Sequence, residues 1–167
     1  GLMQGSLEFA GRIAAKTGCR VMASGFNARI QRGAGRVQVE RVPYVVDLAL
    51  ATLKEVRHVV LAGAKFPVSF FAYPGKPSVL VPAECQSTQL AAVHEDVAAA
   101  LEAVAAELDA SATPPARLAT AKRTELPSGQ VTPTGIGAVL GALLPEDAIV
   151  VDESVSTGRG LFPFTAN

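Results

Sequence analysis

Helical and strand-like segments alternate along the first two thirds of the chain, and this alternation limits the folds that the chain can adopt. Apolar side chains recur at helical spacing in residues 2–15, 45–56 and 94–110. Short, largely apolar runs typical of buried strands lie between them, at residues 19–24, 58–65, 78–82 and 85–91. Strands that are apolar on both faces need cover on both faces, which helices on either side of a parallel sheet supply. We therefore predict an α/β fold with a doubly wound parallel sheet.

Composition and charge exclude several classes of partner. Fifteen basic and fifteen acidic residues give a formal net charge of zero, and aromatic residues make up 5% with no Trp. Such a chain offers neither the basic surface nor the stacking platform that nucleic acids need, so we expect no nucleic-acid partner. No apolar run reaches the roughly 20 residues of a membrane span. We find no signal peptide in the first residues, and expect a cytoplasmic protein without a membrane partner.

The cysteines and histidines do not point to a chemical site. Cys19 and Cys85 are far apart in apolar surroundings and are interpreted as small core residues in a reducing compartment. His58 and His94 have no further ligand at the spacing of a metal site.

A change of composition divides the chain into two parts. Residues 111–130 contain three prolines and no sustained periodicity, which is typical of a linker. Regular structure then restarts, because Thr132 can cap a helix that begins with Pro133, and residues 148–151 read as a strand. We predict a first domain at residues 1–110, a linker at 111–131 and a second domain at 132–167.

Glycine-rich phosphate motifs are incomplete. Gly33-Ala34-Gly35 lacks the third glycine of a dinucleotide fingerprint, and Gly135-Ile136-Gly137 lies inside a predicted helix. We interpret these as turn or helix-packing glycines. A local basic cluster could contact the phosphates of a nucleotide, although a solvated loop or a domain interface is the commoner meaning of such a cluster. Its members are Arg29, Arg32, Arg36 and Arg41.

One further stretch resembles a phosphate-binding strand end. "VVDESVSTGRG" (residues 150–160) has an apolar run, then an acidic and hydroxyl-rich turn, then glycines. Hydroxyls and backbone amides at such a turn suit a phosphate. The alternative is a serine that caps a following helix.

Three stretches together resemble thiamine-diphosphate-dependent enzymes of the acetolactate synthase large-subunit-like group. They are "EFAGRIAAKTGCRVMA", "HVVLAGAKFPVSFFAYPGKPSVLVP" and "LLPEDAIVVDESVSTGRG", the last also similar to the benzoylformate decarboxylase group. The resemblance implies a Rossmann-like central domain, whose first strand we do not identify, then a linker and the first helix-strand unit of a diphosphate-binding domain. It also implies cofactor-binding residues at Glu153, Ser154, Ser156 and Thr157. Ser156 and Thr157 are the best candidates for direct contact with the diphosphate, and Glu153 would orient the turn.

The resemblance also implies a function for a longer parent protein. The parent would decarboxylate a 2-oxo acid and transfer the resulting acyl carbanion, using thiamine diphosphate and magnesium, as a homo-oligomer (a dimer or a tetramer). FAD is left open as a cofactor but is not favoured. The chain lacks the Gly-Asp-Gly segment and asparagine pair that hold magnesium in this family, and the domain that carries the catalytic glutamate. We therefore expect a fragment that is inactive alone and contains no catalytic residue or metal ligand.

Three alternatives stay open. The parent could be a benzoylformate decarboxylase-type enzyme that releases an aldehyde. The chain could also be a free-standing, Rossmann-like nucleotide-binding module whose arginines hold phosphates. Lastly, it could be a structural spacer, because the aromatic-rich loop at residues 66–75 suits a surface that another domain or subunit covers.

Overall fold

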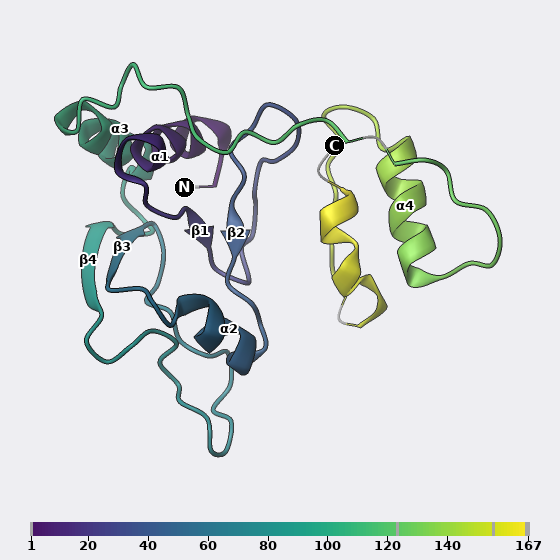
Figure 1. Cartoon of the computed structure of the whole chain (residues 1–167), viewed down its shortest axis with the longest axis horizontal. Helices are drawn as coiled ribbons and strands as arrows, with labels where there is room; N and C mark the ends of the chain where they lie inside the picture. Colours follow the sequence, from purple (N-terminus) through teal and green to yellow (C-terminus); the bar gives the residue numbers. More distant parts are fainter. Residues whose placement is uncertain (1, 123, 155, 166–167) are drawn as a thin grey trace. The chain divides into compact units, whose positions relative to one another are not determined.

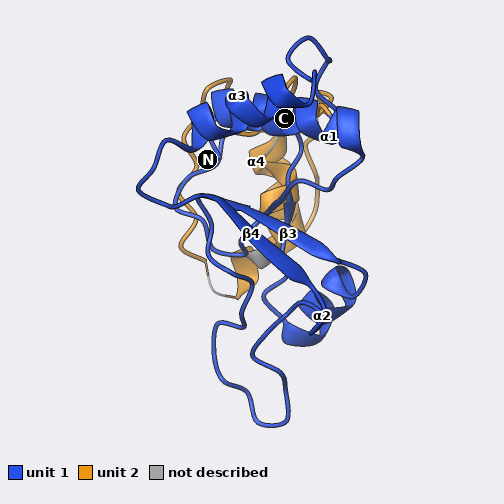
Figure 2. Ribbon diagram, turned by 90° about the vertical axis from the view of Figure 1, so that its left-hand side faces the viewer, with its two compact units in different colours: residues 1–31, 37–117 blue, residues 32–36, 118–167 orange. Residues whose placement is uncertain are grey.

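The computed structural model describes residues 2–122, 124–154 and 156–165 and contains helices and short parallel strands (Figure 1). The predicted α/β class is therefore confirmed. The chain divides into two compact units, coloured in Figure 2: residues 1–31 with 37–117, and residues 32–36 with 118–167. The predicted domain boundaries stay a prediction.

The helices of the first unit lie where the apolar periodicity placed them. Helix α1 (Gln4–Thr17) ends at Gly18, whose φ of 76° and N–H bond to the Ala14 carbonyl (2.8 Å) form a left-handed cap. Helix α2 covers Val46–Leu53. Helix α3 (Val97–Glu107) begins after Asp96, whose carboxylate accepts the Ala99 N–H at 3.0 Å.

The strands pair in parallel but do not join into one sheet. Strand β1 (Met22–Ala23) pairs with β2 (Glu40–Arg41), and β3 (His58–Ala62) pairs with β4 (Gln86–Ala91). Figure 2 shows β3 and β4 side by side. Within the described residues these are two separate two-stranded sheets, so the doubly wound sheet stays a prediction.

The predicted strand at residues 78–82 is wrong. Val79 makes one antiparallel bridge, to Val68, and the Ser69 N–H donates to the Ser78 carbonyl at 2.8 Å. Residues 67–80 therefore form a hairpin in the loop between β3 and β4. Prolines at positions 77 and 82 flank the segment, and because proline has no N–H it cannot complete a ladder.

Two apolar clusters form the core of the first unit. In one, Leu80 and Val81 pack against α2, where Ala49 is fully buried. In the other, Val97 and Leu101 of α3 pack on Ala91 of β4, and Phe9, Ala10 and Ile13 of α1 pack against them. The apolar character of Leu80 and Val81 thus reflects their burial beside α2 and not membership of a strand.

An ion-pair network joins β2 to two other segments of the first unit. Glu40 accepts from Arg20 at 2.6 Å and from Arg117 at 2.7 Å. The hydrogen bonds from Arg20 and then Arg117 lower the pKa of Glu40, while partial burial opposes them. Arg20 also donates to the Thr52 carbonyl at 3.0 Å, so the network links the β1–β2 region to the end of α2.

The second unit is built around one longer helix. Helix α4 (Pro133–Leu143) starts as predicted, because Thr132 accepts the Gly135 N–H at 3.0 Å and Pro133 takes the first position. The 3-10 helices η1 (Thr157–Gly160) and η2 (Phe162–Phe164) both contact α4. The predicted strand at residues 148–151 is wrong: no strand forms there, and Ile149 is 92% exposed.

Candidate functional site

The acidic, hydroxyl-rich turn lies in the second unit, directly before η1. Asp152 accepts the backbone N–H of Ser154 at 2.9 Å and the Ser154 hydroxyl as well. This is the local bonding by which an aspartate replaces a backbone acceptor and reverses the chain. The turn is therefore fixed by Asp152, which is not among the predicted cofactor-binding residues.

Gly158 holds the turn close to η1. Gly158 is buried, and a Cβ placed on it would meet Cβ and Oγ of Ser154. No larger residue fits between η1 and Ser154 unless one of them moves. The Ser154 side chain thus packs on η1 and donates a hydrogen bond to the Asp152 carboxylate, and both contacts stabilise the turn. Its predicted contact with a cofactor stays a prediction.

The remaining predicted site residues are exposed to solvent. Glu153, Ser156 and Thr157 are exposed, and the Ser156 side chain makes no capping bond to η1. The alternative of a helix-capping serine is therefore wrong for Ser156. Val155, between them, lies outside the described residues. Ser156 and Thr157 are consecutive exposed residues at the start of η1, directly after the turn.

The chemistry of this donor set suits part of a diphosphate. Two hydroxyls can donate to phosphate oxygens, whereas the carboxylates of Asp152 and Glu153 repel an anion unless a cation lies between them. No group of three or more His, Cys, Asp or Glu side chains within residues 2–122, 124–154 and 156–165 could hold a metal ion. The turn therefore fits the phosphate end of a cofactor but not its magnesium ion.

The arginine cluster makes its contacts within the protein. In the second unit, Arg32 donates to the Phe162 carbonyl at 2.5 Å and to the Thr165 hydroxyl, and its guanidinium lies 3.7 Å from the centre of the Phe162 ring. Arg36 donates to the Arg32 carbonyl at 3.1 Å and lies 4.0 Å from Asp147. Arg32 therefore holds residues 32–36 against the η2 region, and Arg36 links the same segment to Asp147.

The other two arginines belong to the first unit. Arg41 donates to the Gly25 carbonyl, and Arg29 is exposed. Binding of a nucleotide by the cluster would thus have to compete with the contacts that Arg32, Arg36 and Arg41 already make.

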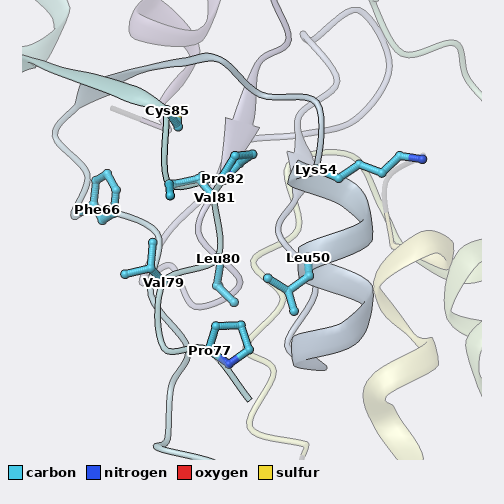
Figure 3. Close-up of a pocket in the computed structure, with 10 residues that line it drawn as sticks. Leu50, Lys54, Phe66, Pro77, Val79, Leu80, Val81, Pro82 and Cys85 are labelled. Carbon is cyan, nitrogen blue, oxygen red and sulfur yellow. The ribbon is translucent and has the colours of Figure 1, made fainter. Parts of the chain in front are cut away.

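A cavity of about 710 Å³ lies in the first unit, between α2 and the segment 77–85 (Figure 3). Leu50 points toward Leu80 and Pro77, and Phe66 and Val79 line the opposite side. Its polar lining residues are Lys54, which extends away from the other side chains in Figure 3, and Cys85. This cavity was not predicted from the sequence. The feature that could have indicated it is the apolar run between Pro77 and Pro82. Its walls offer no pair of groups for acid–base catalysis.

No helix in the described part of the chain has the length and apolar character needed to cross a bilayer.

One comparison with known proteins gives a match across nearly the whole chain. The chain is 47% identical over 152 residues, or 91% of its length, to a protein of Mycobacterium tuberculosis (strain ATCC 25618 / H37Rv) named "Putative acetolactate synthase large subunit IlvX". No family model matches the chain, and no solved structure matches it. The match supports a relationship with acetolactate synthase large subunits.

The match covers much less of the relative than of the chain. The chain spans 29% of the length of this mycobacterial protein. Most of the relative's length therefore lies outside the region that this chain matches.

Proposed function

We propose that the chain is part of a thiamine-diphosphate-dependent enzyme of the acetolactate synthase kind, which decarboxylates a 2-oxo acid and transfers the acyl group to an acceptor. The observation that supports this function is the 47% identity over 91% of the chain to the mycobacterial protein of that name. The chain alone is inactive in this proposal, since it spans 29% of that relative's length.

The cofactor, when bound, supplies the electron sink for decarboxylation, and the protein supplies its position. In this chain the Ser156 and Thr157 hydroxyls donate to oxygens of the diphosphate. The bond from Ser154 to Asp152 and the contact of Ser154 with Gly158 hold the turn in place. Glu153 orients the turn, because its carboxylate would repel the diphosphate if it faced it. Magnesium is held by residues outside the described part of the chain.

The test uses the complete open reading frame that encodes these residues, purified and supplied with thiamine diphosphate and Mg²⁺. The expected product from pyruvate is acetolactate, detected as acetoin after acid decarboxylation. Benzaldehyde from benzoylformate, without acetolactate from pyruvate, would instead support the decarboxylase alternative. The 167-residue chain, assayed in parallel, is expected to form neither product. Absence of both products from a folded parent protein that binds no thiamine diphosphate would overturn the proposal.

The role of the turn has its own test in the same protein. Because a hydrogen bond to a charged group contributes about 1.5–3 kcal/mol, loss of two such bonds in Ser156→Ala with Thr157→Ala is expected to raise the KM for thiamine diphosphate by about 100-fold or more. Ser128→Ala is the matched control, since Ser128 is an exposed serine of the same unit and lies outside the turn. An unchanged KM and an unchanged Kd in titration calorimetry would remove both hydroxyls from the site.

A further inference from the structure

The guanidinium of Arg32 makes several contacts with one short segment of the second unit. Its two terminal nitrogens donate to the Phe162 carbonyl at 2.5 Å and to the Thr165 hydroxyl, and its central carbon lies 3.7 Å from the centre of the Phe162 ring. The Thr165 hydroxyl donates in turn to the Phe162 carbonyl at 3.3 Å. This arrangement uses both the fork and the flat face of a guanidinium, which a lysine side chain does not have.

The segment that carries Arg32 is itself anchored. Residues 32–36 belong to the second unit, although they lie between β1 and β2 in the sequence. The Gly35 N–H donates to the Ala119 carbonyl, and the Ala119 N–H donates to the Arg36 carbonyl, both at 2.8 Å. The Arg36 side chain also donates to the Arg32 carbonyl at 3.1 Å. These bonds fix the backbone from which Arg32 extends, so Arg32 restrains the residues that it contacts.

The residues that Arg32 contacts lie at one end of a continuous run of 3-10 turns. Helices η1 and η2 are separated by Leu161, whose φ of −78° and ψ of −27° are also helical, and both lie beside α4 (Figure 1). The Leu161 N–H donates to the Gly158 carbonyl at 2.9 Å, and the Phe164 N–H donates to the Leu161 carbonyl at 3.0 Å. The first residue of this run is Thr157, about 10 Å from Phe162 at the rise of a 3-10 helix.

Two different contacts therefore hold the two ends of this run. Near its start, Gly158 packs against Ser154, which Asp152 fixes in the turn. Near its end, Arg32 holds the Phe162 carbonyl and the Thr165 hydroxyl. The first contact fixes the local shape of the turn. The second fixes the direction in which the run extends from Gly158, and with it the direction of the backbone at Thr157.

We propose that Arg32 is a positioning residue for the candidate site: by holding Phe162 and Thr165 it sets where the Thr157 hydroxyl lies. The proposal rests on the proposed function, in which that hydroxyl donates to an oxygen of the diphosphate. The two terminal nitrogens of Arg32 are engaged within the protein, so Arg32 acts through Thr157 and not by touching the cofactor. Its loss therefore lowers the affinity for thiamine diphosphate, whereas the rate at saturating cofactor is retained.

The first test measures the Kd for thiamine diphosphate by titration calorimetry of the complete parent protein, without substrate. Arg32→Met keeps the apolar stem but removes the fork, and is expected to raise the Kd by about 2- to 30-fold, with kcat at saturating cofactor unchanged. Thr165→Val removes one of the two bonds and is expected to give a smaller rise. It also carries the test if the Arg32 variant does not fold. Arg29→Met is the control, since Arg29 is an exposed arginine of the same loop.

A second set of variants separates positioning from general loss of stability. Thr132→Ala removes the cap of α4 in the same unit but leaves the contacts of Arg32, and is expected to leave the Kd unchanged. Equal rises in Kd for Thr132→Ala and Arg32→Met would overturn the proposal. In a Thr157→Ala background, Arg32→Met is expected to have a much smaller effect on the Kd, because the hydroxyl that Arg32 positions is already absent. An effect of the same size in both backgrounds would also overturn it.

The same titrations distinguish failure of this proposal from failure of the proposed function. If the unchanged parent protein binds thiamine diphosphate and both Arg32→Met and Thr165→Val bind it with the same Kd, Arg32 has no positioning role, and the proposed function stands. If the unchanged, folded parent protein binds no thiamine diphosphate, both proposals are overturned.

Discussion

Replacing Gly137 by alanine tests how the second unit is packed. Gly137 is buried on α4, and a Cβ placed there would lie 2.6 Å from Cδ2 and 2.9 Å from Cε2 of Phe164. Ordinary contacts between carbon atoms are about 3.5–4.0 Å, so the ring of Phe164 would have to move. Arg32 bonds both Phe162 and Thr165, on either side of Phe164, and this restricts that movement.

Two opposing effects set the size of the change in stability. Alanine is favoured over glycine in a helix interior by about 1 kcal/mol, whereas overpacking a filled site costs about 1–3 kcal/mol. We therefore expect Gly137→Ala to lower the free energy of unfolding by about 1 kcal/mol as the net of these terms. When Phe164 is first shortened to alanine, the clash disappears. The same Gly137→Ala change is then expected to raise the free energy of unfolding by about 1 kcal/mol.

Urea denaturation followed by circular dichroism of the four chains of this double-mutant cycle measures the coupling. The expected coupling between positions 137 and 164 is about 1–3 kcal/mol, the size of the overpacking cost. Gly5→Ala is the control: Gly5 is also helical, nothing lies within 4 Å of the added Cβ, and no coupling to Phe164 is expected. If Gly137→Ala stabilised the unchanged chain as much as it stabilised the Phe164→Ala chain, Phe164 would not pack on α4 as described.

Two further predictions concern individual polar interactions: the ion pairs of Glu40 and the helix cap of Thr132. Because Arg20 and Arg117 lower the pKa of Glu40 in the folded chain, the stability from this carboxylate is present above the unfolded pKa of about 4.3 and is lost as the pH falls through the lower folded pKa. Glu40→Gln is therefore expected to cost about 1 kcal/mol at pH 7 for these partly exposed pairs. In urea titrations this difference should close below pH 4, with Glu102→Gln as the control; a difference that persists at pH 2.5 would contradict the ion-pair origin. Thr132→Ala removes the cap of α4 and should cost about 1 kcal/mol, with Thr132→Ser close to the original stability; equal losses in both variants would argue against capping.

The helices were predictable from the sequence because their signals are local. The start of α4 follows from Thr132 and Pro133, and the end of α1 follows from Gly18, each within a few residues of the bond it makes. Asp96 likewise caps the start of α3 by accepting the Ala99 N–H. Local rules of capping and turn chemistry thus fix where a helix starts and ends without knowledge of the remaining chain.

The strands were less predictable because a strand exists only with a partner. Residues 58–62 and 86–91 pair with each other, as their patterns allowed. Residues 78–82 have an equally apolar pattern, but only Leu80 and Val81 are buried beside α2, and Val79 bridges backward to Val68. A short apolar run cannot distinguish a strand from a buried loop, and the prolines on either side were the signal that could have decided it.

The turn at the candidate site was predictable from the sequence but its internal bonds were not, and its binding of a cofactor stays a prediction. The turn at residues 152–157 was identified from its hydroxyls and its place after an apolar run. The role of Asp152 in fixing Ser154 became visible only with the hydrogen bonds, since any of the neighbouring polar residues could have taken it. The ring contacts of Phe26 and Tyr44 with Phe70 likewise needed the fold, because these residues are far apart in the sequence and meet only in three dimensions.

The segment 148–151 connects the fold to the proposed function. Its β-branched residues favour a strand, yet Ile149 and Val151 are 92% and 78% exposed, and no described residue pairs with them. Burying side chains of this size contributes about 1.5–3 kcal/mol each, so the segment gains most of its possible stability only when another strand covers it. The acidic turn follows directly, and its position depends on where that segment lies. In the proposed site, Asp152 and Gly158 thus fix the local shape of the turn, whereas pairing of the segment 148–151 would fix where the turn lies.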